Sequence, residues 1–208
     1  MTLDEYILCH STPEDEYLHR LYRATNLHLL RPRMASGPLQ GQLLRMLMQV
    51  ARPRTVVEIG TFSGYSALAM ASGMEKGATL YTFECNDEQE CFTRPWIEGS
   101  PYAARIEMIV GDVFELLPPM GLQIDVAYMD ANKREYVEYY DLLFPYLSSG
   151  SLILADNTLW SGHVTDPAYD RDAQTLGIRR FNDHVAADPR VEQVILPERD
   201  GLTLIRVK

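Results

Sequence analysis

Three oxygen-bearing side chains follow two hydrophobic runs that have the composition of β-strands. Asp130 comes directly after residues 124–129, and Asp156 and Asn157 come directly after residues 151–155. If these runs are neighbouring parallel strands, their carboxyl ends bring the three side chains together at one edge of the sheet. Such donors suit a hard divalent cation, Mg²⁺ above all and Mn²⁺ or Ca²⁺ otherwise, and a cluster without histidine or cysteine argues against zinc. Taken singly, Asp130 could cap a helix and Asp156-Asn157 could form a turn, but together they predict a metal site.

A lysine follows the first of these aspartates by three residues. Lys133 is expected at the start of a helix, where the ordinary interpretation of a lysine is a solvated surface residue. A divalent cation beside it would favour the neutral amine, which can accept a proton. Lys133 is therefore the candidate general base, with a surface lysine as the alternative.

A glycine-containing turn, residues 58–66, joins an expected strand to an expected helix. Gly60 and Gly64 permit a tight turn and the close approach of a ligand to the backbone beside a helix N-terminus. The G-x-x-x-G spacing differs from the G-x-G-x-x-G of dinucleotide-binding folds, and Glu58 would repel a pyrophosphate. About 20 residues beyond Gly64, Glu84 ends the next expected strand, where an acid can bond both ribose hydroxyls. A cationic nucleoside such as S-adenosylmethionine fits these features better than a dinucleotide does.

The elements that must position these residues follow from the hydrophobic pattern. Apolar residues at helical spacing predict two N-terminal helices, at about 13–29 and 39–48, and from residue 55 onward short β-rich runs alternate with helical segments. This alternation is typical of parallel βαβ units, in which helices cover both faces of the sheet. The expected strands are 55–59, 79–83, 106–110, 124–129, 151–155, 191–196 and 202–207, and the expected helices between them are 65–74, 86–98, 113–117, 133–147 and 171–187.

The last two expected strands have no helix between them. They are therefore expected to pair as an antiparallel hairpin around Asp200 and Gly201. The fold class predicted from these elements is α/β, with a mostly parallel sheet of about seven strands and one antiparallel edge.

Length, composition and charge narrow the class of protein. The chain has 208 residues, of which 46% are hydrophobic, and this predicts a single domain over residues 1–208. A formal net charge of −10 disfavours general binding of nucleic acid. No apolar run approaches the roughly 20 residues of a membrane-spanning helix, and residues 1–20 lack the features of a signal peptide. The three cysteines have no metal-site spacing and argue against a disulfide framework, so we expect a reducing, cytoplasmic location. From the charge and the apolar runs together, we expect neither a nucleic-acid nor a membrane partner.

Five short motifs in this order lead to a family. They are QGQLL at 40–44, VEIGTFSGYS at 57–66, MDANK at 129–133, DNTLW at 156–160 and DGLT at 200–203. With them the chain resembles the cation-dependent O-methyltransferases that use S-adenosylmethionine, the family of the caffeoyl-CoA and catechol O-methyltransferases, and its bacterial small-molecule members in particular. The resemblance implies a Rossmann-like class I methyltransferase fold, N-terminal helices (residues 1–50) that cover the active site, and a homodimer.

The resemblance also implies roles for individual residues. Asp130, Asp156 and Asn157 match the metal ligands, with Asp130 also near the cofactor. Lys133 matches the lysine proposed to take the proton of the phenol, and Glu84 matches the acid that binds the ribose. The other matches to cofactor positions are Ser36, Glu58, Gly60, Thr61, Phe62, Ser66 and Val113, and the matches to positions bordering the acceptor pocket are Trp160 and Ser161.

Two positions depart from the family pattern, since Asn132 stands where many plant members have an acid and Ser161 where they have asparagine. The expected reaction is metal-dependent transfer of a methyl group from S-adenosylmethionine to a hydroxyl of a small catechol-like or other vicinal-diol phenol. One alternative is a nicotinamide-dependent oxidoreductase, which the glycine spacing and the carboxylate–amide cluster disfavour. The other is a non-catalytic S-adenosylmethionine-binding module, which the intact cluster and Lys133 disfavour.

Overall fold

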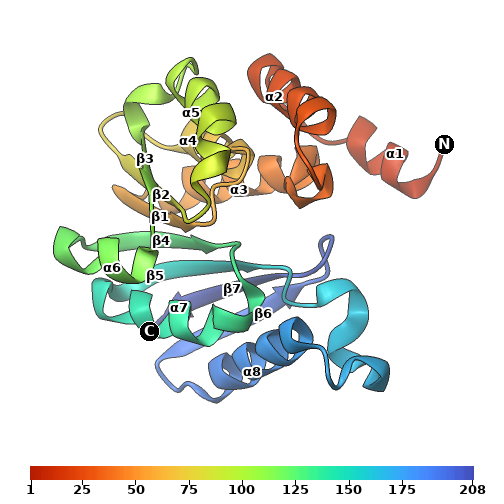
Figure 1. Cartoon of the computed structure of the whole chain (residues 1–208), viewed down its shortest axis with the longest axis vertical. Coiled ribbons are helices and arrows are strands. Elements are labelled where there is room, and N and C mark those ends of the chain that lie inside the picture. Colours follow the sequence, from red (N-terminus) through yellow and green to blue (C-terminus); the bar gives the residue numbers. More distant parts are fainter. The chain divides into compact units, whose positions relative to one another are not determined.

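The structure, a computed structural model, describes residues 1–208 with the exception of the side chain of residue 4. The chain forms two compact units, whose elements are labelled in Figure 1. Unit 1 consists of Met1–Arg54 and Thr61–Gly111, and unit 2 consists of Thr55–Gly60 and Asp112–Lys208. None of the described helices combines the length and the apolar character that crossing a membrane requires.

All seven predicted strands are present, in the order β3-β2-β1-β4-β5-β7-β6. Strand β2 is parallel to β3, β4 is parallel to both β1 and β5, and β7 is antiparallel to β5 and β6. The predicted fold, a mostly parallel α/β sheet with an antiparallel C-terminal hairpin, is therefore confirmed. The strands are β1 Thr55–Ile59, β2 Thr79–Glu84, β3 Ile106–Val110, β4 Ile124–Met129, β5 Leu147–Asp156, β6 Val191–Leu196 and β7 Leu202–Val207.

In unit 1, helix α2 (Glu16–His28) shows how the apolar spacing of the sequence becomes packing. The Asp15 side chain accepts a hydrogen bond from the backbone N–H of Leu18 at 2.8 Å and so caps the first turn. One face of the helix buries Leu18 and Leu21 against Tyr65 of helix α4 (Tyr65–Gly73). The other helices of the unit are α3 Gly37–Ala51 and α5 Glu90–Glu98, with short 3₁₀ helices η1 Pro32–Met34, η2 Asp87–Gln89 and η3 Ala103–Arg105.

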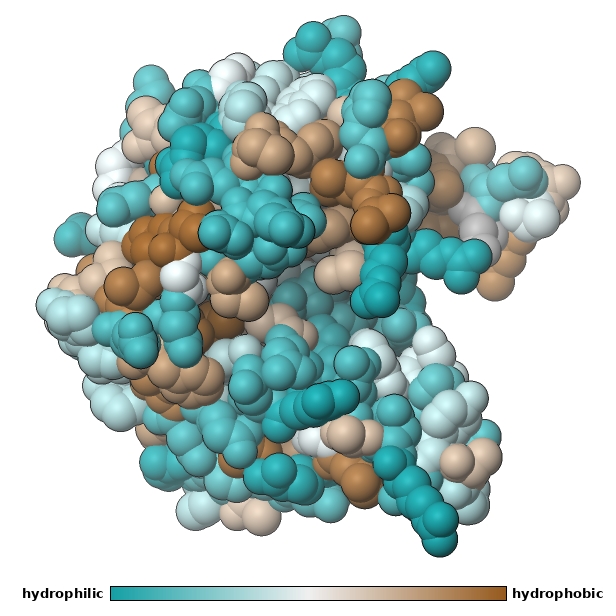
Figure 2. All heavy atoms as spheres, in the orientation of Figure 1, coloured by the Kyte–Doolittle hydropathy of each residue, from teal (hydrophilic) through white to brown (hydrophobic). Residues whose placement is uncertain are grey.

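Helix α1 (Leu3–Cys9) is absent from the sequence-based predictions. It begins with a capping box, in which the side chains of Thr2 and Glu5 each accept a hydrogen bond from the other residue's backbone N–H. Its apolar side chains lie at the surface (Figure 2), with Leu3 74% and Leu8 48% exposed. Because the helix has no buried apolar stripe, hydrophobic periodicity could not reveal it, whereas the Thr-x-x-Glu spacing could have done so.

In unit 2, the registers of three strands bring their carboxyl ends to the same edge. Met129 of β4 pairs with Ile59 of β1 and with Ala155 of β5. The next residues, Asp130 and Asp156, therefore lie at adjacent strand ends, as predicted. The helices of this unit are α6 Val113–Leu116, α7 Tyr136–Leu143 and α8 Ala173–Ala187, with 3₁₀ helices η4 Pro118–Met120, η5 Lys133–Glu135, η6 Phe144–Tyr146, η7 Trp160–Thr165 and η8 Pro167–Tyr169.

The single helix predicted over 133–147 is wrong in its extent. It is divided into η5, α7 and η6, and β5 begins at Leu147, four residues before the predicted start. Pro145 lies in η6, where its missing N–H and its ring prevent the α-helix from continuing. The early part of β5 is polar and exposed, so the hydrophobic pattern carried no sign of it.

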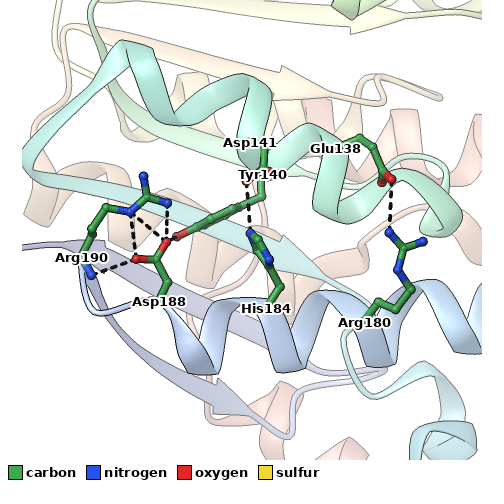
Figure 3. Close-up of polar contacts among 7 residues, drawn as sticks. All are labelled: Glu138, Tyr140, Asp141, Arg180, His184, Asp188 and Arg190. Carbon is green, nitrogen blue, oxygen red and sulfur yellow. Dashed lines mark hydrogen bonds and ion pairs between the residues drawn. The ribbon is translucent and has the colours of Figure 1, made fainter.

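A row of polar contacts joins α7 to α8 and to the residues that follow α8 (Figure 3). Arg180 Nη2 lies 3.4 Å from the carboxylate of Glu138. The Tyr140 hydroxyl donates to Asp188 Oδ2 at 2.9 Å, and the guanidinium of Arg190 donates to the same carboxylate at 2.6 Å. The Asp188 carboxylate therefore accepts hydrogen bonds from both α7 and the residues after α8.

Replacing Asp188 with asparagine is expected to lower the free energy of unfolding at pH 7 by about 1–3 kcal/mol, because charge-assisted hydrogen bonds are lost. The side-chain hydrogen bonds from Arg190 are the main reason why the pKa of Asp188 lies well below its ordinary value. The stabilisation is thus present above about pH 4 and is lost as the pH falls through the lower folded-state pKa. Urea unfolding of the parent and the variant, from pH 7 down through the folded-state pKa of Asp188, measures this difference in the free energy of unfolding. Replacement of the exposed Asp183 with asparagine is the control. A difference that does not narrow at low pH would contradict it.

Candidate active site

Glu84, the predicted ribose-binding acid, lies at the end of β2 and is 8% exposed. Its Oε2 accepts a hydrogen bond from the backbone N–H of Phe62 at 2.8 Å, and its Oε1 accepts one from the backbone N–H of Asn86 at 2.9 Å. Two backbone donors thus hold the carboxylate in one orientation. Each oxygen has a further lone pair, so the group can also accept bonds from two hydroxyls of a ligand.

The turn that precedes α4 is attached to the same strand. Thr61 Oγ1 lies 2.6 Å from Thr82 Oγ1 of β2, and the carbonyl of Phe62 accepts a hydrogen bond from the Thr93 hydroxyl. Phe62 has a φ of 46°, a left-handed conformation that a bulky residue keeps only when its surroundings impose it. In unit 1 the structure therefore brings the predicted positions Thr61, Phe62 and Glu84 together.

In unit 2, Gly60 is required by the close approach of two strand ends. Its φ is 98°, and an added Cβ would lie 2.1 Å from the carbonyl oxygen of Asp130. The backbone N–H of Asp130 also donates to the carbonyl of Ile59 at 2.9 Å. A glycine is needed here because only a residue without a side chain lets β1 and β4 meet in this way.

Lys133 is buried rather than solvated. The residue is 6% exposed, and its Nζ donates hydrogen bonds to Asp130 Oδ1 at 2.7 Å and to the Tyr136 hydroxyl at 2.8 Å. The alternative of a surface lysine is therefore wrong. Nζ also lies 6.0 Å from the centre of the Trp160 ring, so this predicted acceptor-side residue is near the candidate base.

Tyr136 connects this lysine to the strand ends. Its hydroxyl lies 2.9 Å from the carbonyl oxygen of Asp156 and 3.2 Å from that of Met129. Burial raises the pKa of Tyr136 well above its ordinary value, and the carboxylates of Asp130 and Asp156 act in the same direction. Tyr136 is thus a neutral phenol that accepts a hydrogen bond from Lys133 and donates one to a strand end.

Asp156, at the end of β5, is also buried. Its Oδ2 accepts a hydrogen bond from the Tyr128 hydroxyl at 2.8 Å, and its Oδ1 accepts one from the backbone N–H of Asn157 at 2.8 Å. Both carboxylates therefore have donors within the protein, since Asp130 accepts from Lys133 and Asp156 accepts from two donors. The reason is that aromatic and basic side chains on β4, η5 and α7 reach these strand ends from positions that the sequence pattern did not connect with them.

The loop after Asp156 has an unusual backbone. Asn157, Trp160 and Ser161 have φ values of 59°, 47° and 52°, the left-handed region that favours glycine. Asparagine tolerates it better than most residues. The loop thus carries the third predicted metal ligand and both predicted acceptor-side residues in a constrained conformation.

The remaining predicted cofactor positions are buried residues of both units. Ser36 is the N-cap residue of α3, and Ser66 lies in the first turn of α4. Glu58 lies within β1, and Val113 is the first residue of α6. The departing residue Asn132 caps η5, where its side chain accepts a hydrogen bond from the backbone N–H of Arg134.

The sequence reasoning missed two residues of the site, Tyr128 and Tyr136. The sequence-based predictions place Tyr128 within a strand and Tyr136 within a helix and give neither a role in the site. The available signal was chemical, because a buried tyrosine hydroxyl needs a hydrogen-bond partner and strand ends supply carbonyl and carboxylate acceptors.

The donor set at the ends of β4 and β5 fits a hard divalent cation. Carboxylates accept through about four lone-pair positions, so a carboxylate that accepts hydrogen bonds can also be a ligand of a cation. Asn157 adds an amide oxygen from the adjoining position. No cluster of three or more histidine, cysteine, aspartate or glutamate residues suited to a metal is present among the described side chains, so a site here would need the amide and water.

The strand order and the chemistry at the strand ends define a class of fold. The order 3-2-1-4-5 is that of doubly wound Rossmann sheets, in which ligands bind at the carboxyl ends of the strands. Glu84, Asp130 and Asp156 all lie at such ends. The chain therefore has a Rossmann-like fold, here with a seventh strand inserted antiparallel.

Comparison with known proteins identifies the family. The family described as O-methyltransferase matches residues 8–208. A caffeoyl-CoA O-methyltransferase of Stellaria longipes is 30% identical over an alignment of 216 positions, and the alignment covers 98% of this chain and 89% of the relative. This chain belongs to the O-methyltransferase family, so the predicted enzyme class is confirmed and the nicotinamide oxidoreductase alternative is wrong.

Solved structures agree with this assignment. An O-methyltransferase from Bacillus cereus in complex with SAH superposes with a TM-score of 0.90 at 28% identity, covering 99% of this chain and 97% of that one. The O-methyltransferase TomG from Streptomyces achromogenes, involved in tomaymycin synthesis and solved with SAM, gives 0.89 at 28% identity, covering 99% and 96%. The Rossmann-like methyltransferase fold is thus shared over nearly the whole chain.

Proposed function

We propose that this protein transfers a methyl group from S-adenosylmethionine to one hydroxyl of a small phenol with two adjacent hydroxyls, with the help of a divalent cation. The observation that carries the proposal is the buried side-chain nitrogen of Lys133, held between Asp130 and Tyr136. Asp156 and Asn157 follow the neighbouring strand. A proton acceptor beside hard oxygen donors is the arrangement that ionising and orienting a diol requires.

The proposed methyl donor is supported by the geometry around Glu84. The carboxylate is oriented by two backbone donors, as a group that bonds two ribose hydroxyls must be. The SAM and SAH complexes of the two related structures favour the same ligand.

In the proposed reaction, Lys133 acts as the neutral amine, the form that a neighbouring divalent cation favours, and takes the proton of the attacking hydroxyl to become an ammonium. Asp130 and Tyr136 hold its amine in place, so that the proton has a short path. The phenol oxygen then forms a bond to the methyl carbon as the carbon–sulfur bond breaks, and the sulfur keeps the electron pair. A cation held by Asp130, Asp156 and Asn157 would supply positive charge that favours the ionised phenol. Most of the acceleration would come from positioning, because no covalent enzyme intermediate is needed.

The acceptor is proposed from the same residues. Trp160, near Lys133, offers an aromatic surface on which a phenol ring can pack. Ser161 and Asn132 differ from the plant pattern, so plant acceptors are not transferred to this chain. A homodimer located in the cytoplasm, with neither nucleic acid nor membrane as partner, stays a prediction.

The test is a methyl-transfer assay with isotopically labelled S-adenosylmethionine and pairs of isomeric acceptors. Catechols should be methylated in the presence of Mg²⁺, and the matching resorcinols, whose hydroxyls are not adjacent, should not. Equal methylation of both isomers would contradict the vicinal-diol acceptor, and no labelled product from any phenol would contradict the proposed function.

The role of Glu84 gives a separate prediction. Glu84→Ala should weaken S-adenosylmethionine binding about tenfold or more, because it removes the acceptor of the ribose hydroxyls and frees the N–H of Phe62. Calorimetry measures the dissociation constant, with the exposed Glu88→Ala as a matched control. An unchanged dissociation constant in a folded Glu84→Ala protein would rule out the assignment.

A further inference from the structure

The Asp200–Gly201 turn between β6 and β7 belongs to one of the five sequence motifs and has no role in the proposed reaction. In the structure it lies against the loop of residues 157–161. The backbone carbonyl of Asp200 accepts hydrogen bonds from the N–H groups of Leu159 at 2.7 Å and Trp160 at 3.2 Å. The carbonyl of Gly201 accepts one from Thr158 at 3.1 Å. Three successive N–H groups of the loop are therefore bound by two carbonyls of one turn.

Side chains reinforce this contact on both sides. The Ser161 hydroxyl donates to Asp200 Oδ1 at 3.2 Å. Just beyond the turn, the Thr203 and Thr158 hydroxyls lie 2.7 Å apart. The pairing of Asp156 with Leu202 joins β5 to β7 immediately beside the turn. The loop is thus held along its length by one short segment of the hairpin.

Gly201 leaves no space between the turn and the loop. Its φ is 89°, and an added Cβ would lie 2.5 Å from Leu159 Cγ and 2.7 Å from the backbone nitrogen of Leu159. That nitrogen already donates to Asp200, so it cannot withdraw without losing the hydrogen bond. Any side chain at position 201 must therefore displace the loop.

We propose that the Asp200–Gly201 turn is a positioning element that imposes the left-handed backbone of Asn157, Trp160 and Ser161. Non-glycine residues keep such a backbone only where the surrounding structure over-determines it, and the turn supplies those restraints. The turn acts on the site through the loop. The role of the loop as a metal and acceptor site rests on the proposed function. The conformation of the loop can be measured independently of that function.

The experiment uses the full chain with Trp96→Phe, which leaves Trp160 as its one tryptophan. Gly201→Ala is compared with Gly150→Ala, whose φ of 94° is equally unsuited to alanine but whose added Cβ meets nothing within 4 Å. The readouts are acrylamide quenching of Trp160, Mn²⁺ and S-adenosylmethionine affinities by calorimetry, and kcat for methyl transfer.

Gly201→Ala should alter the quenching of Trp160, weaken Mn²⁺ binding and lower kcat by about 10–100-fold, with S-adenosylmethionine affinity retained. Gly150→Ala should leave all four quantities as in the parent. Unaltered Trp160 quenching in folded Gly201→Ala, or the same change in both variants, would overturn the proposal.

Hydrogen exchange in the parent protein is the second measurement if Gly201→Ala does not fold, because the amides of Thr158, Leu159 and Trp160 are the groups that the turn binds. Slow exchange of these amides supports the proposal, and exchange as fast as in an unfolded chain overturns it. If the parent protein methylates no acceptor, the proposed function is wrong. The comparison of Trp160 quenching between parent and variants still tests whether the turn positions the loop.

Discussion

Replacing Lys133 with methionine is expected to lower the rate of methyl transfer by about 10²–10⁴-fold, the usual contribution of a positioned proton acceptor. Methionine fills a similar volume but can neither donate to Asp130 nor take a proton. Binding of S-adenosylmethionine should persist, because Lys133 is not among the proposed contacts of the donor. Single-turnover rates and calorimetric dissociation constants separate the two effects.

Because Lys133 is buried, this experiment needs a control for folding. Its removal leaves the hydroxyl of Tyr136 and one oxygen of Asp130 without a donor, so thermal unfolding must show that the variant is folded at the assay temperature. Lys76→Met removes an exposed lysine and should change neither rate nor stability. Near-normal turnover of Lys133→Met with a saturating acceptor would show that the hydroxyl loses its proton without this residue.

Removal of divalent cations is expected to abolish methyl transfer, and added Mg²⁺ or Mn²⁺ should restore it. The reason is that Asp130, Asp156 and Asn157 offer hard oxygen donors from adjacent strand ends, whereas Lys133 must be neutral to accept the proton and so cannot supply the charge that favours the ionised phenol. Activity is measured in excess chelator and after dialysis into each metal, and elemental analysis records what the protein retains.

Variants of the two residues after β5 locate the metal effect. Asn157→Ala removes only an amide, and Asp156→Ala also leaves the buried Tyr128 hydroxyl without its acceptor, so the asparagine variant is the cleaner of the two. Both should require more metal for recovery while retaining S-adenosylmethionine binding, and the exposed Asp183→Ala should behave as the parent. Full activity in excess chelator, with no metal retained, would show that this cluster is structural.

The strand and helix pattern could be predicted from the sequence because its signals are local. Short β-rich runs ending in Glu84, Asp130 and Asp156 alternate with helical segments, and that alternation implies a parallel sheet whose strand ends meet. Predictions failed where the hydrophobic pattern carried no signal, as in the exposed helix α1, or was continuous across a break, as at Pro145.

The sequence by itself determined the sheet, the edge at which the chemistry lies and the residue types available there. Only the tertiary structure decided their partners: that Lys133 is buried on Asp130, that the Tyr136 hydroxyl joins it to two strand ends, and that the turn at Gly201 packs against Leu159. The physical reason is that hydrogen bonds and close packing between residues distant in the chain depend on register, twist and side-chain direction, which the spacing of residue types along the chain does not specify.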